Sequence, residues 1–166
     1  MAKAVAGKLV LLLAGVVGVG AAFTMAPRVS DWMLYNHSPS MPVGLYMRRD
    51  AGLARGAIIT VRARDVAPAL AAARGFDGPA DRFIKRVAAI EGDEVCAVEG
   101  RLRINDADPV AVPLPSRPNI SPAAWSGCRT LSAGEVLLLG DTPNSFDGRY
   151  WGPIDARLVE GVWRRL

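Results

Sequence analysis

Residues 36–46, which read NHSPSMPVGLY, contain the side chains that are best suited to nucleophilic chemistry. Ser38 and Ser40 lie two residues apart, and the only histidine of the chain, His37, precedes the first serine. A serine hydroxyl is a weak nucleophile until a base removes its proton. His37 is close in sequence, but Pro39 restricts the tight turn that would bring its ring to Ser40. We therefore expect the base to come from elsewhere, and a solvated, proline-stiffened turn without catalytic function remains the alternative.

Lys85, in the segment DRFIKRVAAIEGD, is a candidate for that base and is the only lysine beyond the first eight residues. In an extended strand alternate side chains share a face, so Lys85 lies with Phe83 and Val87, while two arginines mark the other face as more solvated. Desolvation lowers the pKa of a lysine, and a neutral amine is a competent general base. The alternative is that Lys85 reaches water or pairs with an acid such as Asp81 or Asp93.

Ser38 offers a second function, as a donor beside the nucleophile. Because Pro39 restricts the backbone, the Ser38 hydroxyl and the backbone N–H of Ser40 can point at the same oxygen. Two donors directed at a developing oxyanion are what acyl transfer requires.

The N-terminal segment predicts a membrane anchor. Residues 9–26, LVLLLAGVVGVGAAFTMA, contain no charge, and a helix of this length spans roughly 27 Å, close to the hydrocarbon core of a bilayer. Lys3 and Lys8 precede the segment, so the positive-inside rule places the N-terminus in the cytoplasm. A cleaved signal peptide is the alternative, but Pro27 directly after Ala26 disfavours cleavage. We predict an anchor region at 1–27 and an exported domain at 28–166.

The exported domain is predicted to be mainly β, with antiparallel strands separated by glycine and proline. A tight hairpin turn is expected at 99–100, a short helix at 66–74, and a long irregular excursion at 106–129, where five prolines forbid a helix. The predicted strands are 45–48, 57–63, 82–90, 94–98, 102–104, 136–139 and 158–163.

Composition argues against several classes of function. The net charge is +4, but the basic residues are spread along the chain without zinc-ligand spacing or an aromatic cluster, so we expect no nucleic-acid partner, no metal and no cofactor. The only two cysteines, Cys96 and Cys128, suggest one disulfide in an exported domain, with two buried free thiols as the alternative.

Three blocks of the sequence, in order after the anchor, resemble the type I signal peptidases, which are membrane-anchored serine proteases with a Ser-Lys dyad. The first is NHSPSMPVGLY with its serine-methionine pair, and the second contains IKRV followed by GD. The third is GDTPNSFDGRYWG at 140–152. The resemblance implies a fold of coiled antiparallel β-sheets.

Two departures resemble one branch of that family, the TraF-type peptidases of conjugative DNA transfer systems. Pro42 lies two residues after Ser40, where housekeeping signal peptidases usually have a proline three residues after the serine. The last block is also one residue shorter between Asp141 and Ser145. That branch matures a pilin subunit and in some systems joins its ends into a circle.

The resemblance implies a role for each matching residue. Ser40 is expected to be the nucleophile and Lys85 the general base. The N–H of Ser40 and the hydroxyl of Ser38 are expected to form the oxyanion hole, and Ser145 to donate a hydrogen bond that orients the Lys85 amine.

Asp147 and Arg149 are expected to form a supporting ion pair. The implied protein is a serine endopeptidase of the bacterial inner membrane, with its N-terminus in the cytoplasm and its catalytic domain in the periplasm. Its expected substrate is an exported precursor, prepilin, which would be trimmed and possibly circularised, so that the pilus machinery is an indirect partner. A general type I signal peptidase is one alternative, and an inactive anchored component that binds a pilus or secretion assembly is another.

Overall fold

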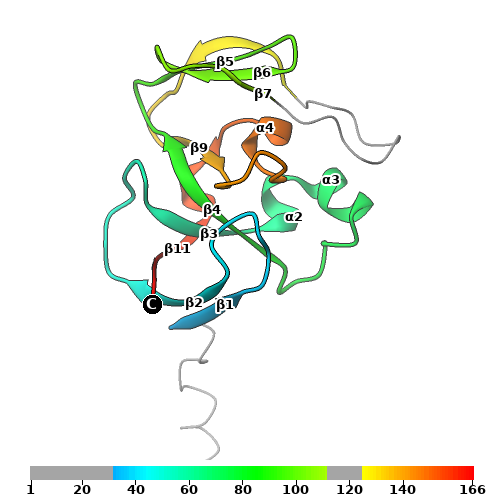
Figure 1. Ribbon diagram of the computed structural model, residues 1–166, viewed down its shortest axis with the longest axis vertical. Helices are drawn as coiled ribbons and strands as arrows, with labels where there is room; N and C mark the ends of the chain where they lie inside the picture. The colour runs from blue at the N-terminus through cyan, green and yellow to red at the C-terminus, as the bar shows by residue number, and fades with distance from the viewer. Residues whose placement is uncertain (1–31, 112–124) are drawn as a thin grey trace, which may run out of the picture. The chain divides into compact units, whose positions relative to one another are not determined.

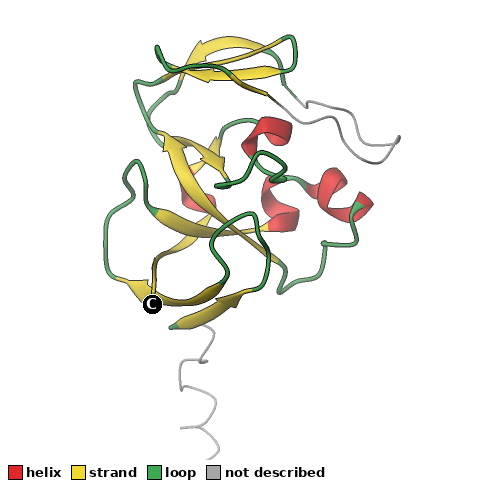
Figure 2. Cartoon of the chain, viewed as in Figure 1, coloured by secondary structure: helices red, strands yellow, loops and turns green. Residues whose placement is uncertain are grey.

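The computed structural model describes residues 32–111 and 125–166, of which Met33–Leu166 belong to one compact unit. Most of the regular structure is strand, which confirms the expected mainly β fold (Figure 2). The predicted anchor at 9–26 and the predicted boundary between residues 27 and 28 lie outside the described residues. Within the described ranges, no helix combines the length and the apolar character that crossing a bilayer requires.

The larger of the two sheets has seven strands (Figure 1). Every neighbouring pair of its strands is antiparallel. The predicted strands in this part of the chain are confirmed, with ends shifted by one or two residues. In spatial order the sheet contains β1 (Met33–Asn36), β2 (Gly44–Arg49), β11 (Val159–Arg165), β3 (Ile58–Arg62), β4 (Arg82–Ala89), β9 (Glu135–Leu139) and β10 (Ile154–Asp155).

A second, four-stranded sheet has the order β7 (Val110–Ala111), β6 (Arg101–Ile104), β5 (Glu94–Val98) and β8 (Gly127–Thr130). The predicted hairpin turn joins β5 to β6, and Glu99 and Gly100 both have positive φ, 49° and 71°. Positive φ at both central residues is the geometry of a two-residue turn whose twist matches the flanking strands.

The prediction of an irregular excursion at 106–129 was wrong at both ends of the segment. β7 and β8 lie inside it and form the two edges of the second sheet. Proline is compatible with strand ends and edge strands, so a high proline content excludes a helix without excluding short edge strands. Residues 112–124 between them lie outside the described part of the chain.

The predicted helix at 66–74 is present in part, as α3 (Pro68–Ala73). Pro68 occupies the first turn, where its missing N–H has no helical partner to lose. A separate helical turn, α2 (Ala63–Val66), precedes it, and Ala67 at φ −148° and ψ 61° divides the two. The remaining short helices are α4 (Gly148–Trp151) and the 3-10 turn η2 (Ala156–Leu158).

β4 is covered on both faces, which sequence alternation anticipated only in part. Phe83 and Val87 pack in the largest apolar cluster, on the face expected to be buried. Ile84 belongs to the face expected to be solvated, yet it is buried in another cluster with Met41 and Trp163. The correction has a tertiary cause, because side chains from the turn after β1 and from β11 cover that face of the strand.

Candidate active site

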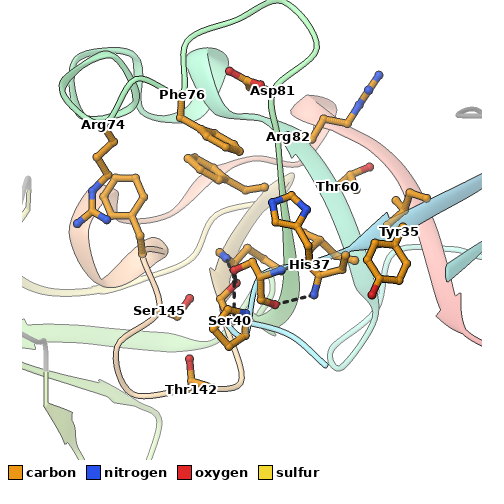
Figure 3. Close-up of a pocket in the computed structure, with 18 of the residues that line it drawn as sticks. Tyr35, His37, Ser40, Thr60, Arg74, Phe76, Asp81, Arg82, Thr142 and Ser145 are labelled. Atoms are coloured by element: carbon orange, nitrogen blue, oxygen red, sulfur yellow. Dashed lines mark hydrogen bonds between the residues drawn. The ribbon is translucent and has the colours of Figure 1, made fainter. Parts of the chain in front are cut away.

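The structure brings Ser40 and Lys85 together although 45 residues separate them. Ser40 lies in the turn between β1 and β2, while Lys85 lies near the middle of β4. Lys85 Nζ is 3.0 Å from Ser40 Oγ, within hydrogen-bond distance. Figure 3 shows the surroundings of Ser40. A lysine amine in this position can exchange a proton with the serine hydroxyl directly.

Lys85 neither reaches bulk water nor pairs with Asp81 or Asp93, the alternatives that the sequence left open. Its side chain is only 3% exposed, so it does not reach bulk water. Asp93 pairs with Arg55 at 2.5 Å, and the Asp81 carboxylate accepts a hydrogen bond from the N–H of Gly78. Among the ion pairs of the described residues, none includes Lys85.

Burial lowers the pKa of Lys85 from 10.5 to about 8. Desolvation is the largest cause, the negative charge of Asp147 opposes it, and the positive charge of Arg149 lowers the pKa further. A useful fraction of the amine is therefore neutral near physiological pH, which is the state that a general base requires.

Asn36 holds the shape of the turn that carries the two serines. It is buried, and its side-chain Nδ2 donates hydrogen bonds to the carbonyl oxygens of Ser38 and Met41 at 2.8 and 3.0 Å. Its Oδ1 accepts a hydrogen bond from the N–H of Ser38 at 3.1 Å. We had not predicted this role, although an asparagine that starts a Ser/Pro-rich turn is a recognised signal for such bonds.

The two expected oxyanion donors, the N–H of Ser40 and the hydroxyl of Ser38, lie side by side but are hydrogen-bonded to each other. The N–H of Ser40 donates to Ser38 Oγ at 3.3 Å, and Ser38 Oγ is 3.1 Å from Ser40 Oγ. The Ser38 hydroxyl must therefore turn toward a substrate before both donors can point at one oxygen. Rotation of a hydroxyl-bearing side chain between staggered positions is sufficient for this change.

His37 is exposed and lines the same cleft as Ser40. None of the hydrogen bonds described for residues 32–111 and 125–166 joins its ring to Ser40.

Asp147 and Arg149 form a buried ion pair that supports the neighbouring loop, as expected. The Asp147 carboxylate is fully buried and receives hydrogen bonds from Arg149 Nε and Nη2 at 2.8 and 2.6 Å and from the N–H of Gly140 at 2.7 Å. Arg149 also donates to the carbonyl oxygens of Thr142 and Pro143. The pair thereby fixes the path of residues 140–143.

That loop in turn holds the backbone of Ser40. The N–H of Asp141 donates to the carbonyl oxygen of Ser40 at 2.7 Å. A Cβ added to Gly140 would lie 2.7 Å from the same oxygen, so only glycine fits there. The Asp141 carboxylate also binds Arg86 through two hydrogen bonds of 2.7 and 2.8 Å, which links the loop to β4 beside Lys85. We had not predicted a role for Asp141 or Arg86, whose only signal was their place in the matching blocks.

Ser145 lies in the cleft but does not make the hydrogen bond that was expected. The residue is buried, and its Oγ has no hydrogen-bond partner among the described residues. The side chain packs against Gly140, while the Lys85 amine contacts Ser40 instead. In this state of the site Ser145 therefore does not orient the amine.

The cleft that contains these residues has a volume of about 720 Å³. It is lined on one side by residues 34–40 and on another by 80–85, and its apolar side chains include Leu34, Phe76 and Phe146. Within the described residues no cluster of His, Cys, Asp or Glu is suited to hold a metal ion. Its size, with apolar side chains beside a few polar and charged groups, is that of a ligand-binding cleft.

Cys96 and Cys128 form a disulfide between β5 and β8. The two cysteines are directly opposite each other in the second sheet, so the bond ties an edge strand to its neighbour. Neither cysteine lines the cleft, and the disulfide is therefore structural.

Comparisons with known proteins agree with the geometry of the cleft. A family model described as "Signal peptidase, peptidase S26" matches residues 4–165. Two proteins from Escherichia coli named "Plasmid transfer protein TraF" are 34% and 33% identical to the chain. The first match covers 97% of this chain and 91% of the relative, and the second covers 92% and 93%.

Two further matches are more limited. A probable thylakoidal processing peptidase 2 from Arabidopsis thaliana is 37% identical over 49% of this chain and 22% of its own length. The crystal structure of a signal peptidase I from Enterococcus faecalis V583 aligns with a TM-score of 0.41 and 22% identity, covering 68% of this chain and 97% of that one.

Proposed function

This chain belongs to the signal peptidase family, peptidase S26, and on that premise we propose that it is a serine endopeptidase with a catalytic dyad of Ser40 and Lys85. The observation that carries the proposal is the 3.0 Å approach of Lys85 Nζ to Ser40 Oγ, made by an amine that is almost fully buried. The Ser40 hydroxyl needs a base to become an effective nucleophile, and the partly neutral amine of Lys85 can act as that base.

In the proposed acylation step, neutral Lys85 takes the proton of Ser40 as Oγ attacks the scissile carbonyl carbon. The N–H of Ser40 and the rotated hydroxyl of Ser38 stabilise the oxyanion that forms. The peptide C–N bond then breaks, and the proton on Lys85 passes to the departing amine. The product is an ester between Ser40 and the N-terminal part of the substrate.

In the proposed deacylation step, Lys85 takes a proton from the group that attacks the ester. If that group is water, the result is hydrolysis and Ser40 recovers its proton. If it is the amine of a peptide, the result is a new peptide bond, and an amine from the same chain closes a circle. The same two residues therefore support trimming and cyclisation alike.

An extended substrate has an open strand edge to bind. β3 covers one edge of β4 along residues 82–86, but β9 pairs with the other edge only from Arg86 onward. In the described part of the chain, the second edge of residues 82–85 carries no strand, and these residues line the cleft. We propose that the precursor adds there as a strand, which supplies backbone hydrogen bonds independent of its side chains.

We propose that the substrate is an exported precursor of a conjugative transfer system, specifically its prepilin. The similarity to two plasmid transfer proteins over more than nine-tenths of the chain supports this assignment over a general secretory role. The charge-free segment at 9–26 supports an inner-membrane anchor, with residues 28–166 in the periplasm where exported precursors emerge.

Co-expression with a candidate prepilin from a conjugative transfer system tests the proposal. Wild type should process it, whereas Ser40→Ala and Lys85→Ala should abolish processing while accumulating normally in the membrane. His37→Ala serves as the matched control and should retain processing. Mass spectrometry of the product distinguishes a linear from a circular chain. Normal processing by Lys85→Ala would refute the dyad, and processing of a general secretory precursor in preference to prepilin would favour the housekeeping role.

A further inference from the structure

Arg74 is a charged group in the cleft that the proposed chemistry does not use. It follows α3 directly and lines the cleft together with Phe76 and Phe146 (Figure 3). Its guanidinium carbon is 4.0 Å from the centre of the Phe146 ring, a cation–π contact that holds the charge in one place. The side chain is exposed, so its donors are accessible to a ligand.

The other cations of the cleft are already engaged. Arg82 pairs with Glu160 at 2.5 Å, and Lys85 contacts Ser40. By contrast, no carboxylate among the described residues forms an ion pair with Arg74. Asp81, the carboxylate that lines the cleft, accepts a hydrogen bond from the N–H of Gly78 instead. Arg74 is therefore a cation of the cleft for which the described residues supply no carboxylate partner.

A line of aromatic rings connects this charge to the catalytic centre. Lys85 Nζ is 5.8 Å from the centre of the Phe83 ring, that ring is 5.5 Å from Phe146, and Phe146 is 4.0 Å from the Arg74 guanidinium. An extended peptide advances about 3.4 Å per residue. A peptide at the scissile position can therefore reach Arg74 within about five residues.

We propose that Arg74 is a specificity-determining residue that binds a carboxylate of the precursor within about five residues of the scissile bond. The inference rests on the proposed peptidase function and names one feature of its substrate. A guanidinium binds a carboxylate through two parallel hydrogen bonds, a geometry that a neutral amide cannot match. The carboxylate has two sources, the side chain of Asp or Glu and the C-terminus of a short trailing segment.

The test uses the full-length enzyme in detergent and a panel of alanine-rich peptides. In one arm each peptide has an amidated C-terminus and a single Glu, which stands at a different position in each peptide. Every Glu peptide is compared with a peptide that has Gln at the same position. In the other arm all side chains are neutral, and the peptides differ in their distance to a free or amidated C-terminus. The readouts are kcat/KM with the cut located by mass spectrometry, and binding of the same peptides to Ser40→Ala.

Arg74→Gln, Arg74→Lys and Arg74→Glu are compared with the control Arg64→Gln. Arg64 is exposed, pairs with Asp65 and does not line the cleft. Wild type should prefer the carboxylate by about tenfold in kcat/KM at one position, the effect of roughly 1.4 kcal/mol. The preference should vanish in Arg74→Gln, persist in part in Arg74→Lys, reverse toward a Lys-bearing peptide in Arg74→Glu, and remain in Arg64→Gln.

The outcomes separate this inference from the proposed function. Cleavage without any carboxylate preference, or a preference that survives in Arg74→Gln, overturns the inference and leaves the peptidase function intact. Carboxylate-dependent binding to Ser40→Ala that is lost when Arg74→Gln is added, without cleavage by the wild type, supports a carboxylate site at Arg74 but overturns its role in choosing a scissile bond, and it counts against the proposed function. If the peptides are neither cut nor bound in a carboxylate-dependent manner, the inference is wrong.

Discussion

Raising the pH from about 6 to about 9 should increase kcat/KM until the amine of Lys85 is fully deprotonated. The reason is that kcat/KM reports the ionisation of the free enzyme, where the proposed base acts only in its neutral form. Burial lowers the pKa of that amine to about 8. Catalytic competence is therefore present above this pKa and lost as the pH falls through it.

The size of the effect follows from the same pKa. With a pKa of about 8, roughly a tenth of the amine is neutral at pH 7 and roughly a hundredth at pH 6, so the rate should fall about tenfold per pH unit. An amine with the ordinary pKa of 10.5 would be about 300 times less often neutral at pH 7. Burial of Lys85 thus contributes more than two orders of magnitude to the fraction of competent enzyme.

The assay is a kcat/KM profile on a peptide without groups that titrate in this range. The control is His37→Ala, because His37 lines the same cleft and is the only histidine of the chain. Its profile should keep the inflection at about 8. A rate that continues to rise tenfold per unit through pH 10 would mean that Lys85 is not desolvated. An inflection that disappears in His37→Ala would assign the base to the histidine.

Three further substitutions test the parts that support the dyad. Asp147→Asn should lower the free energy of unfolding by about 3–5 kcal/mol, because it leaves the buried guanidinium of Arg149 without its countercharge. Denaturant titration measures this free energy, and a loss below about 1 kcal/mol would contradict the prediction. Gly140→Ala should lower kcat by about tenfold or more, because the added Cβ would lie 2.7 Å from the carbonyl oxygen of Ser40. Single-turnover kinetics measure this effect, and an unchanged rate would show that the loop adapts to the extra methyl group. Cys96→Ala should cost about 2–4 kcal/mol of stability through the loss of a disulfide between residues 32 apart, while the inflection of the pH profile stays at about 8.

Short-range patterns predicted most strands and the placement of Lys85. Alternation along β4 placed Lys85 with Phe83 and Val87, and the structure buries all three. The hairpin turn at Glu99 and Gly100 followed from local turn chemistry in the same way. These features depend on side chains a few residues apart, whose relative directions the strand or turn geometry sets.

Sequence patterns failed where long-range packing decides the outcome. Ile84 was expected on a solvated face, but residues from the turn after β1 and from β11 bury it. The edge strands β7 and β8 were missed because their partners, β6 and β5, supply the hydrogen bonds that define them. Both errors depend on which distant segment of the chain lies alongside.

Sequence patterns alone were enough to single out the two candidate residues of the proposed dyad, a serine in a proline-stiffened turn and a lysine on the apolar side of a strand. Three features became visible only in the folded chain: Lys85 lies within hydrogen-bond distance of Ser40, the N–H of Asp141 donates to the Ser40 carbonyl oxygen, and Ser145 makes no hydrogen bond to the amine. The two kinds of feature differ in the sequence distance over which the responsible interactions act. Strand period and turn chemistry act over a few residues, whereas a contact across 45 residues depends on the order of strands in the sheet and on the loop that a buried ion pair holds in place.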